Sequence, residues 1–329
     1  MGKARAARKW AAAAALGGGG AGLLGGTVIA ILFAEAMLAK RTIGEPVGQA
    51  PDADGLYGDG PGDPISFAVL GDSTACGLGV DTAEETPGAL LAAGLASLSD
   101  RPVQLSVAAF SGAETQHLED QVDQALAVEP DVALVIIGAN DVTHRTLPSD
   151  SVRLLVEGVR RLREAGCQVV VGTCPDLGTV EPLAFPLRQL ARMWSRRLAA
   201  AQTIAVVENG ARTVSLGSLL GPEFAAAPRE LFGPDRFHPS AAGYASAAVA
   251  LLPSIAAAIG YWPEDEDADT PLGEGQILPI SYAAVRAARS AGTEVAATDV
   301  AGHERGPRGR WALLRRHPHR QVELREKTS

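Results

Sequence analysis

Short apolar runs alternate with longer amphipathic stretches through the middle of this chain, and this pattern constrains its fold more than any other feature. Four runs are rich in β-branched residues and lack strict polar alternation, which is typical of strands covered on both faces: Ile65–Leu70, Val103–Ala108, Val132–Ile137 and Val169–Gly172. A fifth strand is predicted at Thr203–Val207. Helices are predicted at Thr86–Ser97, Thr115–Ala127, Ser149–Ala165, Pro186–Gln202 and Ser240–Ile259. This order predicts a parallel, doubly wound α/β sheet.

Residues 1–41 do not follow this pattern and predict a membrane-targeting segment. Four cations, within residues 3–9, precede an uncharged stretch from Trp10 to Ala34 that is long enough to span a bilayer, although it is rich in glycine. The alternative is a cleaved signal peptide, because Ala34-Glu35-Ala36 has the small-x-small form of a cleavage site. We favour an uncleaved anchor, since the apolar run is longer than a usual signal-peptide core. In both cases the main domain lies outside the cell membrane.

The composition of the flanking segments divides the rest of the chain. Residues 42–63 are rich in Gly, Pro and Asp and predict a flexible linker, residues 64–261 form the main domain, and the charged segment 262–329 is predicted to be disordered. The formal net charge of −9 argues against a nucleic-acid partner. Cys76, Cys167 and Cys174 match neither a zinc spacing nor a disulfide framework and are expected to be buried. The sequence specifies no oligomeric state.

Polar, potentially reactive residues follow several of the predicted strands. The first strand is followed by Gly71-Asp72-Ser73, the second by Ser111-Gly112 and the third by Gly138-Ala139-Asn140-Asp141. A further group, Asp235-Arg236-Phe237-His238, stands just before the last predicted helix. In an open parallel sheet, ligands bind outside the carboxyl ends of the strands. We therefore expect all four groups to meet at one edge of the sheet.

These residue types suit acyl transfer. A serine hydroxyl such as that of Ser73 needs a nearby base to take its proton, and His238 can be that base. Asp235, three residues before His238, can bind the other ring nitrogen and hold the required tautomer. The backbone N–H groups of Ser73 and Gly112 and the side-chain amide of Asn140 can donate to the oxyanion of a tetrahedral intermediate.

The same residues resemble the conserved blocks of the SGNH/GDSL hydrolases. Gly71-Asp72-Ser73 and the following Thr74-Ala75-Cys76-Gly77 look like block I, Gly112 like the block II glycine, Gly138 to Asp141 like block III, and Asp235 to His238 like block V. The resemblance covers about Ile65 to Gly260. It implies the SGNH hydrolase fold, a flavodoxin-like three-layer α/β/α sandwich with a parallel five-stranded sheet. It also implies ester hydrolysis through an acyl-serine without a metal or organic cofactor.

The expected function is therefore that of a serine esterase outside the cell membrane, acting on a small-molecule, lipid or acylated-glycan ester. Two alternatives stay open. An acyltransferase would use the same Ser73, Asp235 and His238 with an alcohol in place of water. A non-catalytic module could bind an anion at the helix N-terminus after the first strand, but the complete set of reactive residues argues against it. The loop Gly172–Gly178 is expected to line the substrate cleft.

Overall fold

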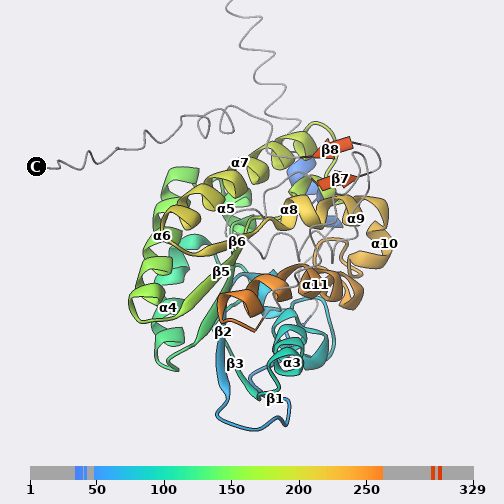
Figure 1. Cartoon of the computed structure of the whole chain (residues 1–329). Coiled ribbons are helices and arrows are strands. Elements are labelled where there is room, and N and C mark those ends of the chain that lie inside the picture. The colour runs from blue at the N-terminus through green and yellow to red at the C-terminus, as the bar shows by residue number, and fades with distance from the viewer. Residues whose placement is uncertain (1–33, 40, 43–47, 262–297, 301–302, 306–329) are drawn as a thin grey trace, which may run out of the picture.

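The computed structural model describes residues 34–39, 41–42, 48–261, 298–300 and 303–305, and its centre is a six-stranded sheet (Figure 1). The strand order is β1-β3-β2-β4-β5-β6. The strands are β1 (Gly55–Tyr57), β2 (Ile65–Gly71), β3 (Val103–Val107), β4 (Val132–Ile136), β5 (Gln168–Gly172) and β6 (Arg212–Val214). Strands β2 to β6 are parallel, while β1 pairs antiparallel with β3 at the edge.

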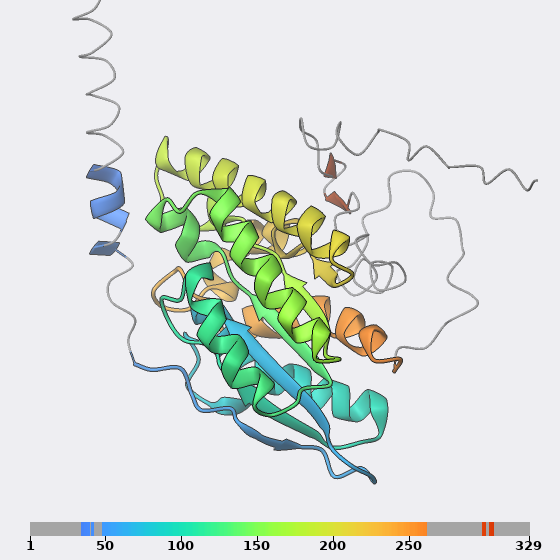
Figure 2. The same cartoon turned by 90° about the vertical axis from the view of Figure 1, so that its left-hand side faces the viewer.

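Helices cover both faces of this sheet, as Figures 1 and 2 show. One face packs against α3 (Pro87–Ser99) and α11 (Ala241–Ala258), and the other against α4 (Leu118–Leu126), α6 (Pro148–Glu164) and α7 (Leu187–Glu208). Alternate residues of β4 enter the two cores, with Leu134 in one and Val135 in the other. Both are almost fully buried, which explains why the strands lack polar alternation. The predicted α/β/α sandwich is confirmed, and the five parallel strands have the flavodoxin-like order.

Shorter helices occupy the loops around the carboxyl ends of the strands. They are α2 (Ser73–Cys76), α5 (Ala139–His144), α8 (Leu216–Leu219), α9 (Gly221–Ala226) and α10 (Pro228–Leu231), with 3-10 turns η1 (Ala83–Glu85), η2 (Thr115–His117) and η3 (Leu177–Thr179). The predicted cap of the last helix is confirmed, because the Ser240 side chain accepts the backbone N–H of Gly243. The helices predicted before β3, β4, β5 and β6 are also present.

The fifth predicted strand is wrong. Thr203–Val207 continues α7, and the fifth parallel strand is β6, five residues further along the chain. Leu198, Gln202 and Val206, spaced by one helical turn, are all buried on the same side of α7. The run at 203–207 is apolar and β-branched, and a run this short does not distinguish a strand from the buried end of a helix.

The segment predicted as a flexible linker is ordered over part of its length. Residues 55–57 form β1, and two side-chain hydrogen bonds stabilise the approach to it. Asp54 Oδ1 accepts the backbone N–H of Val107 at 2.7 Å, and the Tyr57 hydroxyl donates to the carbonyl of Ala53 at 2.8 Å. In the segment predicted to be disordered, β7 (Thr298–Val300) and β8 (His303–Arg305) form an antiparallel pair.

The membrane-targeting prediction falls mostly outside the described residues. Residues 34–39 are helical and lie beside the start of α7, where Glu35 Oε2 accepts the backbone N–H of Leu187 at 3.0 Å. Among the described residues, α11 alone is long and apolar enough to cross a membrane. More than half of α11 is buried against the sheet and α3, so its composition is that of a core helix.

Candidate active site

Ser73 lies at the sharp turn between β2 and α2. Gly71 has φ +137°, and a Cβ there would lie 1.9 Å from the carbonyl oxygen of Ile136, so only glycine fits. Asp72 donates its N–H to that same oxygen at 3.0 Å and caps α2 by accepting the N–H of Thr74. Ser73 is thus the first residue of a helix whose initial amide groups have no intrahelical partner.

His238 connects Ser73 to Asp235. Its Nε2 lies 3.1 Å from Ser73 Oγ, and its Nδ1 lies 2.5 Å from Asp235 Oδ2. The second carboxylate oxygen of Asp235 accepts the backbone N–H groups of Phe237 and His238 at 2.9 and 3.0 Å. This tight turn needs Arg236 in the left-handed region, with φ +57°. The sequence therefore brings three predicted residues into one hydrogen-bonded chain.

The charge of Asp235 is stabilised by its surroundings. Partial burial by itself would raise the pKa of this carboxyl, but the hydrogen bonds from His238 and from two backbone N–H groups outweigh it and lower the pKa below its ordinary value. Asp235 is therefore an anion at neutral pH. Its negative charge faces Nδ1 of the imidazole, where it favours the tautomer with the proton on Nδ1 and leaves Nε2 free to accept from Ser73.

Asn140, the predicted oxyanion donor, lies in the first turn of α5. Its Nδ2 donates to the carbonyl of Ala113 at 2.9 Å, which orients the amide and uses one of its two N–H groups. Ser73 and Asn140 line the same pocket. Gly112 has φ +82° and directly precedes Ala113, whose carbonyl binds Asn140. Gly112 itself does not line the pocket.

The pocket beside Ser73 is small and apolar, with a volume of about 80 Å³. Its walls come from segments far apart in the chain, and they include Leu177, Val180, Leu216, Leu220, Phe224, Phe232, Phe237 and Tyr244. Pro175, Asp176 and Leu177, from the loop after β5 that is expected to line the substrate cleft, line this pocket. Asp176 Oδ2 accepts from Arg196 Nη2 at 2.7 Å, and Oδ1 accepts the N–H of Gly178, so this wall is braced from α7.

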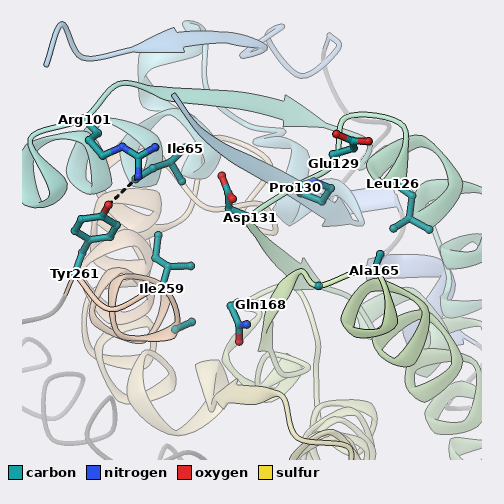
Figure 3. A pocket seen from close by; sticks show the side chains of 12 residues that line it. Ile65, Arg101, Leu126, Glu129, Pro130, Asp131, Ala165, Gln168, Ile259 and Tyr261 are labelled. Atoms are coloured by element: carbon teal, nitrogen blue, oxygen red, sulfur yellow. Dashed lines mark hydrogen bonds between the residues drawn. The ribbon is translucent and has the colours of Figure 1, made fainter. Parts of the chain in front are cut away.

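A larger depression of about 920 Å³ lies at the opposite, amino end of the strands (Figure 3). Arg101 donates there to the Tyr261 hydroxyl and to the carbonyl of Asp63, and Asp131 accepts the N–H of Ser66. These hydrogen bonds connect the segments that meet at the amino ends of the strands. The depression contains none of the predicted reactive residues.

Two buried glutamines near the site were not predicted. Gln121 binds the backbone of Gly71, and Gln202 binds those of Ile137 and Cys174. The sequence carries a weak signal for Gln121, because it occupies the same face of α4 as Leu118, Val122 and Ala125. A polar residue at a core position must have a polar partner.

The three cysteines are free and buried, as predicted. Burial raises the pKa of Cys76 to about 11. Although this thiol lies in α2 with Ser73, it is protonated at neutral pH and is not an activated nucleophile.

Burial also raises the pKa of Asp72 to about 6, although the hydrogen bond from Thr74 opposes the shift. The folded state therefore binds this proton more tightly than the unfolded state does, and the associated stability is lost as pH rises through about 6. Asp72→Asn keeps an oxygen for the cap but cannot ionise. As pH rises from 5 to 8, the free energy of unfolding of Asp72→Asn should therefore increase by about 1.4 kcal/mol relative to that of the wild type. Urea unfolding at both pH values measures this gain, and a constant difference between the two proteins would contradict it.

Comparison with known proteins shows the family of this chain. The model of the GDSL-like lipase/acylhydrolase family matches residues 69–246. A GDSL-like esterase of Mycobacterium tuberculosis is 40% identical over 277 residues, which are 79% of this chain and 87% of that protein.

Solved structures similar to this chain include an acetyl xylan esterase variant from Geobacillus stearothermophilus, at 17% identity and a TM-score of 0.46, covering 64% of this chain and 99% of the other. A lipase/acylhydrolase from Enterococcus faecalis has 17% identity and a TM-score of 0.45, covering 58% and 94%. The family match includes Ser73, Asn140, Asp235 and His238. This chain belongs to the GDSL-like lipase/acylhydrolase family of serine hydrolases.

Proposed function

We propose that this protein is a serine esterase that cleaves short-chain acyl or acetyl esters through an acyl-serine intermediate, with Ser73, His238 and Asp235 as its catalytic triad. The observation that carries the proposal is the continuous hydrogen-bonded chain from Ser73 Oγ through His238 to Asp235. The triad is recognised by such geometry and not by position in the sequence.

In this mechanism His238 Nε2 takes the proton of Ser73 as Oγ attacks the ester carbonyl. The backbone N–H of Ser73 and the free N–H of Asn140, two residues that line the pocket, donate to the resulting oxyanion, and the N–H of Gly112 is kept as the third donor on the sequence prediction alone. His238 then protonates the leaving alcohol, and the acyl group stays on Ser73. Water, deprotonated by His238, attacks this acyl-enzyme and releases the acid. An alcohol in place of water would make the protein an acyltransferase, and we propose water because the 40% identical relative is an esterase.

The size of the pocket supports a short acyl group. The pocket beside Ser73 measures only about 80 Å³ and has mostly apolar walls, which favours a short, uncharged acyl chain. Acetyl, propionyl and butyryl chains are of this kind. The apolar walls exclude charged acyl groups, because burying an unpaired charge is costly. We propose that the esters are those of small molecules, lipids or glycans outside the cell, since the uncharged N-terminal stretch precedes the domain.

The proposal is tested with the purified full-length protein and the p-nitrophenyl esters of acetate, butyrate, hexanoate and octanoate. We expect kcat/KM to be highest for acetate or butyrate and to fall steeply towards octanoate. A flat or rising profile would contradict the short-chain assignment. A separate assay adds an acetylated oligosaccharide and a second glycan as acceptor. Free acetate as the product supports hydrolysis, whereas an acetylated acceptor would show a transferase.

Leu220→Ala is expected to shift this profile towards longer chains. The Leu220 side chain is buried and lines the pocket, so its truncation adds room for further methylene groups. One methylene is worth about 1–3 kcal/mol in a hydrophobic pocket, and the ratio of kcat/KM for hexanoate over acetate should rise about tenfold or more.

The matched control is Leu155→Ala, which makes the same truncation in α6, within the core on the other face of the sheet. It should lose similar stability, about 2–5 kcal/mol, with an unchanged hexanoate-to-acetate ratio. An equal shift of the ratio in both variants would show that the chain-length preference changes with the stability of the fold and not with the size of the pocket.

A further inference from the structure

The hydrogen-bond ladder of the sheet ends where the reactive residues begin. Strand β3 ends at Val107, and the chain beyond it makes two more backbone hydrogen bonds to β2, from Ala108 N to the carbonyl of Val69 at 2.9 Å and from Phe110 N to the carbonyl of Gly71 at 3.3 Å. Carbonyl groups of β2 accept both of them, and neither involves the N–H of Gly71. The N–H of Gly71 at the end of β2 therefore lacks a strand partner on this side. A buried backbone N–H without a partner costs about 1–3 kcal/mol, so such a position requires a substitute.

Gln121 supplies that substitute from α4. Its Oε1 accepts the N–H of Gly71 at 2.7 Å, and its Nε2 donates to the carbonyl of the same residue at 2.9 Å. The Gln121 side chain is completely buried. A primary amide presents one acceptor and one donor side by side, as the backbone of a neighbouring strand does. The residue held in this way is two positions before Ser73.

Gln202 makes the corresponding contact from α7, on the other half of the site. Its Nε2 donates to the carbonyl of Ile137 at 3.0 Å, and its Oε1 accepts the N–H of Cys174 at 2.8 Å. These two backbone groups lie just beyond β4 and β5, where the ladder between those strands has ended. Gln202 is also completely buried, and its Nε2 would be 3.1 Å from a Cβ at Gly138. The loop that it holds leads directly to Asn140.

We infer that Gln121 and Gln202 are positioning residues of the active site, Gln121 for the nucleophile Ser73 and Gln202 for the oxyanion donor Asn140. The inference rests on the proposed function. Neither glutamine contacts substrate. Each joins a helix to the strand end from which one reactive group projects, and so sets the position of that group relative to the other. Because a misplacement of 1 Å can cost about 100-fold in rate, these contacts act on kcat more than on substrate binding.

The test compares Gln121→Met and Gln202→Met with the wild type. Methionine keeps the length of the side chain but removes both amide contacts. We expect kcat for p-nitrophenyl butyrate to fall about tenfold or more in each variant, with KM within about threefold of the wild-type value. The measurement is made well below the unfolding temperature of each variant, with the folded fraction checked by near-ultraviolet circular dichroism.

Thr203→Val is the matched control. Thr203 is buried and follows Gln202 in α7, and its hydroxyl donates to the carbonyl of Ala199 within the same helix. Its loss should lower stability while kcat stays at the wild-type value. If the methionine variants keep wild-type kcat, or lose it only in proportion to their folded fraction, the inference is overturned.

Gln121→Glu gives a second readout that a purely structural role would not move. A protonated glutamic acid still offers a carbonyl to the Gly71 N–H and a hydroxyl donor to the Gly71 carbonyl, whereas the carboxylate turns an unfavourable oxygen towards that carbonyl. The kcat of this variant relative to the wild type should therefore rise as pH is lowered from 9 to 6. A constant ratio over this range, in a folded variant, would argue against the inference.

The two levels of the proposal fail separately. If Ser73→Ala retains activity, the proposed function is wrong. If Ser73→Ala is inactive and the glutamine variants have wild-type kcat, only the positioning role is wrong.

Discussion

Ser73→Ala should lower kcat for p-nitrophenyl butyrate by about 10⁴-fold or more, to the limit of detection of the assay. In the proposed mechanism Ser73 Oγ is the protein atom that forms a bond to the acyl group. Among the described residues, no second hydroxyl lies within hydrogen-bonding distance of His238. The fold should be unaffected, because the change removes one oxygen atom and alanine is well tolerated in a helix. Stopped-assay kinetics and thermal unfolding of the purified full-length protein measure both effects.

Cys76→Ala is the control for this variant. Cys76 is buried in the same short helix and is the nearest sulfur nucleophile in sequence, but burial raises the pKa of its thiol to about 11. We expect its activity to stay within a few-fold of the wild-type value. Full activity in Ser73→Ala would refute the triad assignment. Loss of activity in Cys76→Ala, with the fold intact, would point to the thiol instead.

The sequence was sufficient to place the candidate site because its residues follow directly on strands that are apolar on both faces. The run Ile65–Leu70 consists of six apolar or small residues and forms β2 together with Gly71, and Ser73 follows Leu70 by three positions. The Asp235–His238 pair stands at the N-terminus of α11, where Ser240 caps the helix. Parallel topology alone then brings these segments to one edge of the sheet.

Residues whose role depends on packing could not be predicted in this way. Gln121 and Gln202 act on backbone groups 50 and 28 residues away in sequence, and nothing local identifies those partners. The apolar run at 203–207 fits a strand as well as a helix until the adjacent turn at Gly210 and the buried position of Val206 are known. The pocket walls include residues of α8 and α9, which are too short to show a helical period.

The edge strand β1 was missed for a related reason. Gly55 to Tyr57 is a short segment among Gly, Pro and Asp residues, which locally favour a linker. Its conformation comes from pairing with β3 and from the carboxylate of Asp54, which accepts the N–H of Val107. Tertiary contacts therefore override local preference at this edge.

Asp235→Asn should lower kcat by about 10⁴-fold while leaving the loop in place. Asp235 has two separate roles, since Oδ1 accepts the N–H groups of Phe237 and His238, while Oδ2 faces His238 Nδ1. An asparagine can fill the first role only with its carbonyl oxygen, which directs its NH₂ group at Nδ1. Nδ1 must then accept, so the neutral imidazole carries its proton on Nε2, where it cannot take the proton of Ser73.

Because the asparagine oxygen still accepts the N–H groups of Phe237 and His238, we expect the thermal stability of Asp235→Asn to be close to that of the wild type. A loss of kcat without a loss of stability would then come from the changed tautomer and not from unfolding of the loop. Asp131→Asn is the matched control, because its carboxylate also accepts a backbone N–H, from Ser66 at 2.8 Å, but lies at the amino end of the strands. It should retain wild-type kcat. A loss of less than about tenfold in folded Asp235→Asn would mean that His238 acts without a carboxylate partner, and the proposed triad would reduce to a Ser73–His238 pair.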